Sequence, residues 1–414
     1  MKSWKKVTIE ECVDILGDGL HGTPKYTKDG EYAFINGNNF VDGKIFIKPD
    51  TKKVDFLEFE KYKKSLNDRT IFVSINGTLG RVATYNNEKI VLGKSACYFN
   101  VKNQINKDFI FYVVSSNKFK RYMEIHATGT TIKNFSLKQM RNYSFLLPDI
   151  ETQNKIATIL KTIDSKIENN NKINNNLEQQ AVLLFKEWFT DFVNTSSNLI
   201  ETQFGLIPDT FRLLKNGELP IVVTDYVANG SFASLKANVT LYQEPNYAYF
   251  IRNTDLKSGS FKVFVDENSY RFLSKSTLYG GEIIISNVGD VGSVFLCPKL
   301  NKPMTLGNNV IMLRPEQDNL KYYLYVWFKW LYGQSLIQGI KGGSAQPKFN
   351  KTDFKNLPIF LPTDDLLEQF QQMVKPIFEL IEKNNEENQA LIVTRDTLLP
   401  KLISGEFDIS DIEL

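Results

Sequence analysis

The sequence predicts an α+β protein in which two copies of one α/β domain are joined by two long antiparallel coiled-coil helices, with pseudo-two-fold symmetry. The first observation is a repeat, because residues 129–177 recur without a net gap as residues 343–391 and thirteen positions carry the same residue type in both windows. The second is a strand-like pattern that becomes helical after Pro148 and again after Pro362. Two long copies favour a duplicated domain over a solenoid, which stacks many short units.

The duplication extends upstream of these windows with small changes in loop length. The segment IFVSINGTLGRV, which starts at Ile71, aligns with IIISNVGDVGSV, which starts at Ile283. The offset drifts by two residues there and returns to 214 where Leu92-Gly93 matches Leu306-Gly307. Each copy is therefore predicted to be a globular unit followed by a helix.

The changes of pattern also predict the domain boundaries. We expect globular domains at residues 1–148 and, after a linker, within residues 191–362. The intervening helices are expected at residues 149–190 and 363–404, where Asp149 and Thr363 stand in position to cap them. Residues 405–414 are expected to be a C-terminal tail.

A seam of residues at 3-4 spacing runs along each predicted helix. Such a heptad seam is typical of helices that pair, and two copies in one chain favour antiparallel packing into a spacer rod. From Leu160 to Leu184 the rod would span roughly 36 Å at about 1.5 Å per residue, close to one turn of B-DNA at ~34 Å. The seam residues are Leu160, Ile163, Ile167, Asn170, Asn174 and Leu177 in the first helix and Val374, Ile377, Ile381, Asn384, Asn388 and Leu391 in the second.

Four asparagines interrupt the middle of this seam, and they allow two interpretations. Polar seam residues commonly fix the register of a coiled coil, so Asn170, Asn174, Asn384 and Asn388 would mark where the helices cross near the pseudo-two-fold axis. Alternatively, the Asn-rich stretch is a frayed portion that faces solvent.

Composition limits the class of protein. A chain of 414 residues with 42% apolar content can support two or three domains. The most apolar run, YYLYVWFKWLYG from Tyr322, is too short to cross a bilayer, so we expect a soluble cytoplasmic protein. Cys12, Cys97 and Cys297 have no paired spacing and are expected to be free, buried thiols.

Charge divides unevenly along the chain. Residues 1–150 carry 24 lysines and arginines against 16 acidic residues, and residues 201–362 carry 17 against 13. Residues 363–414 are acidic, with 4 basic and 12 acidic residues. The pattern favours globular units that face phosphate and helices that face protein, although ordinary solvated lysines explain the second unit's charge equally well.

The motifs of catalytic or cofactor sites are weak or missing in the sequence. Gly17-Asp18-Gly19-Leu20-His21-Gly22 matches the dinucleotide fingerprint formally, but Thr23-Pro24 follows and no helical periodicity succeeds it. The two histidines and three scattered cysteines are too few for a zinc centre or a nucleophile with its base. We therefore predict a binding protein without a metal site or catalytic residues.

Candidate DNA contacts occur at matching places in the two copies. The loops 129–134 and 343–348 combine flexible backbone, small hydroxyls and a cation, which suits phosphate contact. Asparagine and arginine can read adenine and guanine edges, although each alone is more often a turn residue. The candidates are Asn36, Asn38, Asn39, Lys94, Thr130, Thr131 and Lys133 in the first copy and Arg252, Asn253, Thr254, Asn308, Asn309, Ser344 and Lys348 in the second.

With these features placed, the chain resembles the specificity subunit of type I restriction-modification enzymes over essentially its full length. The resemblance rests on GDGLHGTPKY at Gly17, FINGNNFVDGKI at Phe34, the segment from Gly129 through FLLPDIETQNKIATIL, GLIPDTF at Gly205 and KLISGEFDI near the end. It implies two target-recognition domains, each reading one part of a bipartite DNA sequence, held apart by two antiparallel helices. The second loop departs from the pattern, because it reads GSAQPKF and lacks the TTI of the first.

The resemblance also implies a role within a larger complex. The subunit is expected to be non-catalytic and to recruit two methyltransferase subunits, which bind S-adenosylmethionine and methylate adenine, and restriction subunits, which use ATP and Mg²⁺. The complex would act in the bacterial cytoplasm. Two other classes remain open at this point: a single-chain nuclease or methyltransferase with an unrecognised site, and a helical scaffold protein without a DNA function.

Overall fold

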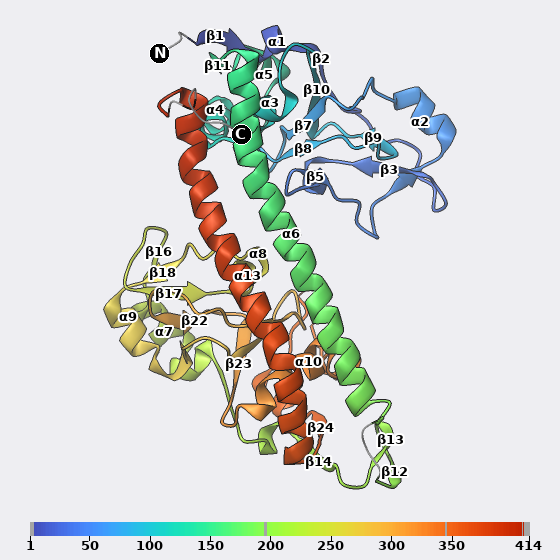
Figure 1. Ribbon diagram of the computed structural model, residues 1–414, viewed down its shortest axis with the longest axis vertical. Coiled ribbons are helices and arrows are strands. Elements are labelled where there is room, and N and C mark those ends of the chain that lie inside the picture. The colour runs from blue at the N-terminus through green and yellow to red at the C-terminus, as the bar shows by residue number, and fades with distance from the viewer. Residues whose placement is uncertain (1–3, 194–196, 344–345, 408, 410–414) are drawn as a thin grey trace. The chain divides into compact units, whose positions relative to one another are not determined.

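The computed structural model describes residues 4–193, 197–343, 346–407 and 409, and within them the chain forms two compact units (Figure 1). Unit 1 comprises residues up to 168 together with those from 390, and unit 2 spans residues 169–389. Two helices contribute to both units: α6 (Ile150–Phe189) and α13 (Asp364–Ser404).

Unit 1 is built on a four-stranded sheet in the order β2-β10-β7-β8, with antiparallel neighbours. Smaller sheets surround it: β6-β3-β9, in which β3 and β9 are parallel, and the pairs β1-β11 and β4-β5. The strands are β1 (Lys5–Thr8), β2 (Val13–Asp18), β3 (Tyr32–Ile35), β4 (Phe40–Val41), β5 (Lys44–Ile45), β6 (Lys53–Val54), β7 (Thr70–Ser74), β8 (Val82–Thr84), β9 (Ile90–Leu92), β10 (Ala96–Val101) and β11 (Ser144–Leu147).

Helices cover the central sheet of unit 1 and close its core. Every residue of β7 and β10 is buried, as expected for central strands that are covered on both faces. Phe109, Phe119 and Phe135 lie fully buried in the main core cluster. The helical segments are α1 (Ile9–Cys12), η1 (Gly37–Asn39), α2 (Phe56–Tyr62), α3 (Lys107–Ser115), α4 (Asn117–His126) and α5 (Leu137–Asn142).

Unit 2 repeats this architecture with a larger second sheet. Its central sheet has the order β15-β23-β20-β21, and its second sheet the order β16-β18-β17-β22-β19. The pairs β12-β13 and β14-β24 complete it. The strands are β12 (Leu199–Thr202), β13 (Gly205–Pro208), β14 (Arg212–Lys215), β15 (Ile221–Asp225), β16 (Leu241–Tyr242), β17 (Ala248–Ile251), β18 (Phe264–Val265), β19 (Thr277–Leu278), β20 (Ile283–Ser286), β21 (Val294–Leu296), β22 (Met304–Leu306), β23 (Val310–Pro315) and β24 (Pro358–Leu361).

The core of unit 2 is aromatic. Most of the run from Tyr322 that looked most apolar in sequence lies in α10, where residues 322–328 are buried and Trp327 and Phe328 are fully enclosed. Phe185 and Phe189 of α6 and Phe370 of α13 enter the same cluster. The helical segments are η2 (Asn216–Glu218), η3 (Tyr226–Asn229), α7 (Phe232–Asn238), α8 (Asn253–Ser258), α9 (Glu267–Phe272), η4 (Ser274–Ser276), α10 (Asn319–Lys329), α11 (Leu331–Gly339) and α12 (Lys351–Lys355).

The two units share their topology strand by strand. The strand pair β10 and β7 corresponds to β23 and β20, and β10 maps onto β23 at an offset of 214 residues. The parallel pair of β3 and β9 corresponds to the parallel pair of β17 and β22. The β1-β11 pairing of Lys5 with Leu147 corresponds to the β14-β24 pairing of Arg212 with Leu361. The predicted duplicated α+β fold is therefore confirmed.

Within unit 2, α6 and α13 pack antiparallel through the asparagine part of the seam. Asn170 donates to Asn388 Oδ1 at 3.0 Å, and Asn384 donates to Asn174 Oδ1 at 2.8 Å. Residue numbers rise along one helix as they fall along the other, which defines the antiparallel direction. All four side chains are buried, with exposures between 1% and 9%, so these asparagines do not form a solvent-facing stretch.

The asparagine contacts obey the repeat. The bond from Asn170 to Asn388 becomes the bond from Asn384 to Asn174 when 214 is added to or subtracted from each number. A second couple of bonds behaves in the same way, since Asn174 donates to Asn385 and Asn388 donates to Asn171, each at 2.9 Å. The helices therefore cross with local two-fold symmetry at this cluster.

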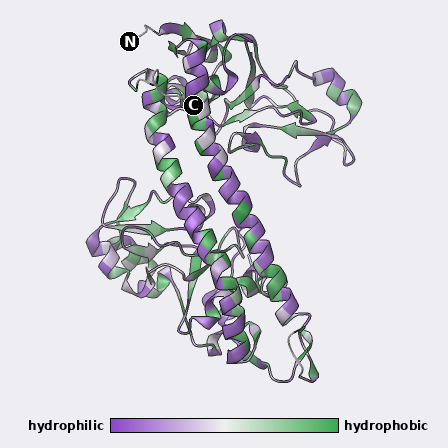
Figure 2. Cartoon of the chain, viewed as in Figure 1, coloured by the Kyte–Doolittle hydropathy of each residue, from purple (hydrophilic) through white to green (hydrophobic). Residues whose placement is uncertain are grey.

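Within unit 1, the same two helices meet at their other ends. Ile156 and Leu160 of α6 share the unit 1 core with Leu398 and Leu402 of α13, which lies beside α6 there (Figure 1). Arg395 donates to Asp164 at 2.8 Å. The twelve seam residues are all buried or half-buried across the two units, and Figure 2 shows polar and apolar residues alternating along both helices.

All three cysteines are free and buried. Burial raises the pKa of the Cys12 thiol to about 11 and shifts the pKa of the Cys97 and Cys297 thiols upward as well. Among the helices in the described ranges, none combines the length and apolar character needed to span a bilayer.

Candidate nucleic-acid interface

Three loops of unit 1 meet at one end of its central sheet, and together we call them the loop edge of unit 1. They are the hairpin loop 75–81 between β7 and β8, loop 93–95 before β10, and loop 127–135 after α4. Gly77 N donates to Lys133 O at 3.0 Å, and Phe135 N donates to Ile75 O at 2.8 Å. Ile75 N donates to Ser95 O at 2.9 Å, so backbone hydrogen bonds hold the three loops as one surface.

Unit 2 presents the same three loops, which form the loop edge of unit 2. They are the hairpin loop 287–293, loop 307–309, and loop 341–349, whose residues 344 and 345 lie outside the described part. Gly289 N donates to Pro347 O at 2.8 Å and Phe349 N donates to Asn287 O at 3.0 Å. Asn287 N donates to Asn309 O at 3.1 Å, so each contact of unit 1 has its counterpart.

Glycines make the hairpin loop possible in both units. Gly77 and Gly80 have φ values of +71° and +75°, and Gly289 and Gly292 have +78° and +94°. Such left-handed conformations are strained for residues with a Cβ atom. The spacing of two glycines three residues apart therefore encodes the same tight turn twice.

Asn36 joins the loop edge of unit 1 through Ser95. The Ser95 hydroxyl donates to Asn36 Oδ1 at 2.9 Å, and Asn76 Nδ2 donates to Lys94 O at 3.3 Å. Asn38 is exposed, whereas Asn39 is 8% exposed. The Asn39 side-chain amide accepts from Asn36 N within its own turn and donates to Phe46 O. Among these three predicted residues, Asn38 is therefore accessible, Asn36 is half-buried against Ser95, and Asn39 supports the turn.

The remaining predicted residues of unit 1 lie on exposed loops. Thr130, Thr131 and Lys133 are exposed in loop 127–135, and Lys94 is exposed in loop 93–95. Reciprocal backbone bonds between Thr128 and Asn134, of 2.9 and 2.7 Å, close the base of the longer loop. The structure thus brings Asn36, Lys94 and the candidates of loop 127–135 together at a single edge.

In unit 2 the predicted residues are spread over two adjoining elements. Arg252 caps α8, and its guanidinium makes two bonds with the buried Asp255, of 2.9 and 2.7 Å. Asn253 and Thr254 follow in the first turn of that helix. Asn308, Asn309 and Lys348 are exposed at the loop edge, and Ser344 lies outside the described residues.

A carboxylate ends the first central strand in each unit. In unit 1, Asp18 at the end of β2 contacts His21 Nε2 at 2.5 Å. In unit 2, Asp225 at the end of β15 contacts Lys351 Nζ at 3.0 Å. Asp18 lies opposite Cys97 and Asp225 opposite Ile311, which are equivalent positions of the repeat. The formal dinucleotide motif therefore ends a strand beside the loops and leads into further loop, not into a helix.

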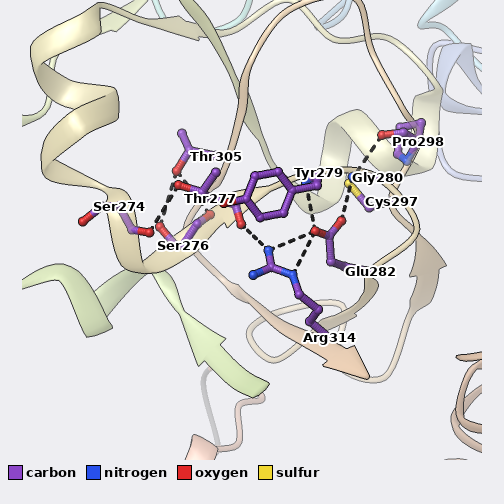
Figure 3. A network of polar contacts seen from close by, with 10 residues as sticks. All are labelled: Ser274, Ser276, Thr277, Tyr279, Gly280, Glu282, Cys297, Pro298, Thr305 and Arg314. Atoms are coloured by element: carbon purple, nitrogen blue, oxygen red, sulfur yellow. Dashed lines mark hydrogen bonds and ion pairs between the residues drawn. The ribbon is translucent and has the colours of Figure 1, made fainter. Parts of the chain in front are cut away.

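The other end of the unit 2 sheet holds a buried polar network (Figure 3). Glu282 is 3% exposed and accepts bonds from Arg314 and from the backbone N–H groups of Tyr279 and Gly280. The Arg314 guanidinium also lies 4.6 Å from the centre of the Tyr279 ring. At the equivalent place in unit 1, Thr70 donates to Asn100 at 2.7 Å. The polar groups of this network bond to one another and link neighbouring strands. We therefore assign the network a role in stabilising the fold.

The hairpin loops were missed as site elements by sequence reasoning. The alignment of the two hairpin loops was visible in the sequence. The sequence did not show, however, that Gly77 and Gly289 donate backbone hydrogen bonds to the candidate phosphate loops. The signal that could have found them is the paired Ser-x-x-Gly-x-x-Gly pattern, from Ser74 and from Ser286. Among the described residues, no group of three or more histidine, cysteine or acidic side chains could hold a metal ion.

Comparison with known proteins identifies the family to which the chain is similar. Residues 1–179 and 205–392 match the type I restriction modification DNA specificity domain, so each repeat carries one match. The MjaIX specificity subunit of Methanocaldococcus jannaschii, a type I restriction enzyme subunit, is 25% identical over 427 residues, which cover 99% of this chain and 95% of the relative. The HindI specificity subunit of Haemophilus influenzae is 24% identical and covers 98% of this chain and 100% of the relative.

A solved structure agrees at the level of the fold. The crystal structure of a type I restriction-modification system S subunit from M. genitalium has a TM-score of 0.52 and 19% sequence identity, and the match covers 99% of this chain and 97% of that one. The family match over both repeats, together with the two relatives, confirms the resemblance drawn from the residues. The chain belongs to the specificity subunits of type I restriction-modification systems, which are their non-catalytic DNA-recognition subunits.

Proposed function

We propose that this subunit reads a bipartite DNA target, one part with each loop edge. The observation that carries the proposal is the recurrence of the same three-loop surface in both units, held by equivalent backbone bonds from Gly77 and Gly289. Backbone N–H groups, hydroxyls and cations on such loops suit phosphate contact, while asparagine and arginine side chains can read base edges.

We assign the two readings to the domains expected from the sequence. Residues 1–148 and the globular part of 191–362 would be the target-recognition domains, residues 149–190 and 363–404 the spacer helices, and 405–414 the tail. The asparagine contacts between α6 and α13 support a fixed register for the helix pair. A fixed register would set the number of base pairs between the two parts of the target.

The same proposal places the chemistry on partners. Two methyltransferase subunits would bind S-adenosylmethionine and methylate an adenine that has been flipped out of the duplex. Restriction subunits would bring ATP and Mg²⁺. This chain would then place both over the target in the bacterial cytoplasm.

Methylation mapping is the direct test. The chain is co-expressed with its methyltransferase subunits in a host without such a system, and methylated adenines are mapped in the host DNA. We expect methylation at a single bipartite sequence with a constant gap. Methylation at a continuous site, or none above the level without this chain, would refute the proposal.

Lysine substitutions test the loop edges as contact surfaces. Lys133→Ala and Lys348→Ala should each lower affinity for every DNA sequence by a similar factor, because phosphate contacts carry no sequence information. Binding is measured by fluorescence anisotropy on cognate and scrambled duplexes. An effect on cognate DNA alone would reassign these lysines to base reading.

A further inference from the structure

The two loop edges have the same backbone arrangement but differ in charge. Four positions that the repeat makes equivalent carry a cation in unit 1 and a neutral side chain in unit 2. The residue numbers differ by 212 at the hairpin and by 214 elsewhere, as the aligned strands require. The four pairs are Arg81 and Ser293, Lys94 and Asn308, Lys120 and Gln334, and Lys133 and Pro347.

Local contacts establish the equivalence of Lys120 and Gln334. A Cβ atom added to Gly80 would lie 3.1 Å from Lys120 Cγ, so the lysine stem covers the hairpin of unit 1. A Cβ atom added to Gly292 would lie 3.0 Å from Gln334 Oε1, and Gln334 Nε2 donates to Gly292 O at 2.8 Å. The same position on the hairpin is therefore contacted by the side chain of a lysine in unit 1 and by the amide of a glutamine in unit 2.

The other pairs are fixed by the loop contacts already described. Lys133 O and Pro347 O accept from Gly77 N and Gly289 N. Lys94 precedes Ser95, and Asn308 precedes Asn309, whose carbonyls accept equivalent bonds from the hairpins. Arg81 and Ser293 close the hairpins, because their carbonyls accept from the nitrogen atoms of Ser74 and Ser286.

The unit 1 cations are available to a ligand. Arg81, Lys94, Lys120 and Lys133 are all exposed, and none of them belongs to an ion pair identified within the described ranges. Helix α4 adds exposed Lys118 and Arg121, where α11 has Tyr332 and Ser335. A single acid, Glu124, accompanies them on α4.

Unit 2 compensates only in part. Lys341 and Lys348 stand on its longer loop where unit 1 has Ala127 and Asn134. Its hairpin also carries an acid, Asp290, which Lys257 neutralises at 2.7 Å. The unit 2 edge thus has fewer cations, and part of its hairpin charge is already paired.

From this difference we propose that the two parts of the target are held by different forces. Unit 1 binds the DNA backbone through these four cations, three on its loop edge and Lys120 on the adjoining helix α4, whereas unit 2 binds chiefly through neutral hydrogen-bonding groups. The inference rests on the proposed DNA reading by both edges and assigns most of the salt-dependent affinity to unit 1. Each phosphate neutralised contributes a slope of roughly 0.9 to the fall of log K with log salt, so four contacts contribute roughly 3.6.

The test compares variants in which cations are replaced by neutral residues. Three of the four unit 1 cations are replaced by their own counterparts from unit 2, and Lys133 is replaced by glutamine because its counterpart is Pro347. The four-position variant R81S/K94N/K120Q/K133Q, made in the full chain with its methyltransferase subunits, is titrated against a cognate duplex at several KCl concentrations. We expect the salt slope to fall by roughly 3 to 4. The salt slope of the unit 2 variant K341Q/K348Q should fall by at most about 2.

Two matched controls keep the result interpretable. K102Q/K107Q neutralises two lysines beyond the opposite end of β10, and its slope should equal that of the unaltered protein. The reverse exchange S293R/N308K/Q334K should steepen the slope by roughly 2 to 3 and thus tests the inference without removing any native cation.

The outcomes separate this inference from the proposed function. An equal or smaller slope change in the unit 1 variant than in K341Q/K348Q, with bipartite specificity intact, would overturn the charge asymmetry alone. If the unaltered complex shows no preference for a bipartite sequence, the proposed function fails first. A changed preference among bases in the unit 1 variant would also contradict the inference, because backbone cations do not read sequence.

Discussion

Gly19 illustrates how single residues fix the loop edge. A Cβ atom at this position would lie 2.2 Å from Gly93 O and 2.4 Å from Leu92 O, so only glycine lets the segment after β2 pass this close to the end of β9. Leu20 then bridges Gly93, and loop 93–95 is held in place. The residue that looked like part of a nucleotide fingerprint is therefore needed for backbone packing.

The substitution Gly19→Ala should destabilise unit 1 by about 1–3 kcal/mol, because backbone atoms must move to admit the methyl group. Gly22→Ala is the matched control, since its nearest neighbour would be Leu20 Cδ1 at 3.9 Å. Urea unfolding monitored by circular dichroism measures both. Equal stability of the two variants would show that the backbone around residue 19 admits the methyl group without a loss of stability.

Arg252 is the residue whose role the structure constrains in a new way. Its guanidinium is oriented by Asp255, which is 4% exposed, while the Arg252 side chain itself is 36% exposed. An arginine held in this manner can still present its remaining N–H groups to a guanine edge.

We expect Arg252→Ala to alter base preference at one position of the half-site read by unit 2, with a discrimination loss of about 1–3 kcal/mol. Competition binding against duplexes substituted one base pair at a time measures this. Asp255→Asn keeps the shape and weakens the orientation, so it should produce a smaller change at the same position. A uniform loss at all positions would instead indicate a folding role.

At the scale of elements, the α6 and α13 pair combines two kinds of contact. The asparagine cluster in unit 2 is polar and symmetric, whereas the place where Arg395 meets Asp164 in unit 1 has Ala181 and Phe378 as its repeat counterparts. Tyr112 adds a 2.7 Å bond to the same Asp164. The helices thus keep a common seam while each unit completes it with different chemistry.

Removing one amide from the cluster should loosen this seam. Asn388→Ala deletes the acceptor of Asn170 and the donor to Asn171, and leaves buried polar groups without partners, which costs about 1–3 kcal/mol. Hydrogen exchange of α13 near residue 388 should become faster. Asn176→Ala, at an exposed position of α6, is the control and should stay within about 0.5 kcal/mol. Unchanged exchange in Asn388→Ala would argue against a register role.

At the scale of the whole molecule, all three thiols of the chain are buried. Cys12, Cys97 and Cys297 lie in the cores, where the low polarity disfavours the thiolate and raises each pKa. Since the folded pKa lies above the unfolded value of 9.0, each thiol contributes to stability below about pH 9. That contribution is lost as pH rises through the folded pKa, which is about 11 for Cys12.

We therefore expect no reaction of the native protein with a colorimetric thiol reagent at pH 8, and reaction of three thiols after denaturation. The free energy of unfolding should fall between about pH 9 and 11. Cys12→Ala should reduce that fall, because it removes one of the titrating groups. Rapid labelling of the native chain would place at least one thiol at the surface.

The sequence by itself determined the duplicated fold, the two long helices and the seam between them, because period and hydrophobic spacing are local properties of the chain. Even Asp149 could be named in advance as the helix cap, and its carboxylate accepts from Thr152 N at 2.9 Å. The family followed from the same phrases.

Only the tertiary structure decided how the candidate residues group. Strand pairing brings Asn36 to Ser95 and Lys133 to Gly77 across more than fifty residues of chain, and no local pattern encodes such contacts. It also showed that Asn39 supports a turn, that Arg252 is held by Asp255, and that Lys120 covers the hairpin. Spacing along a chain specifies elements, whereas the neighbours of a side chain depend on how those elements pack.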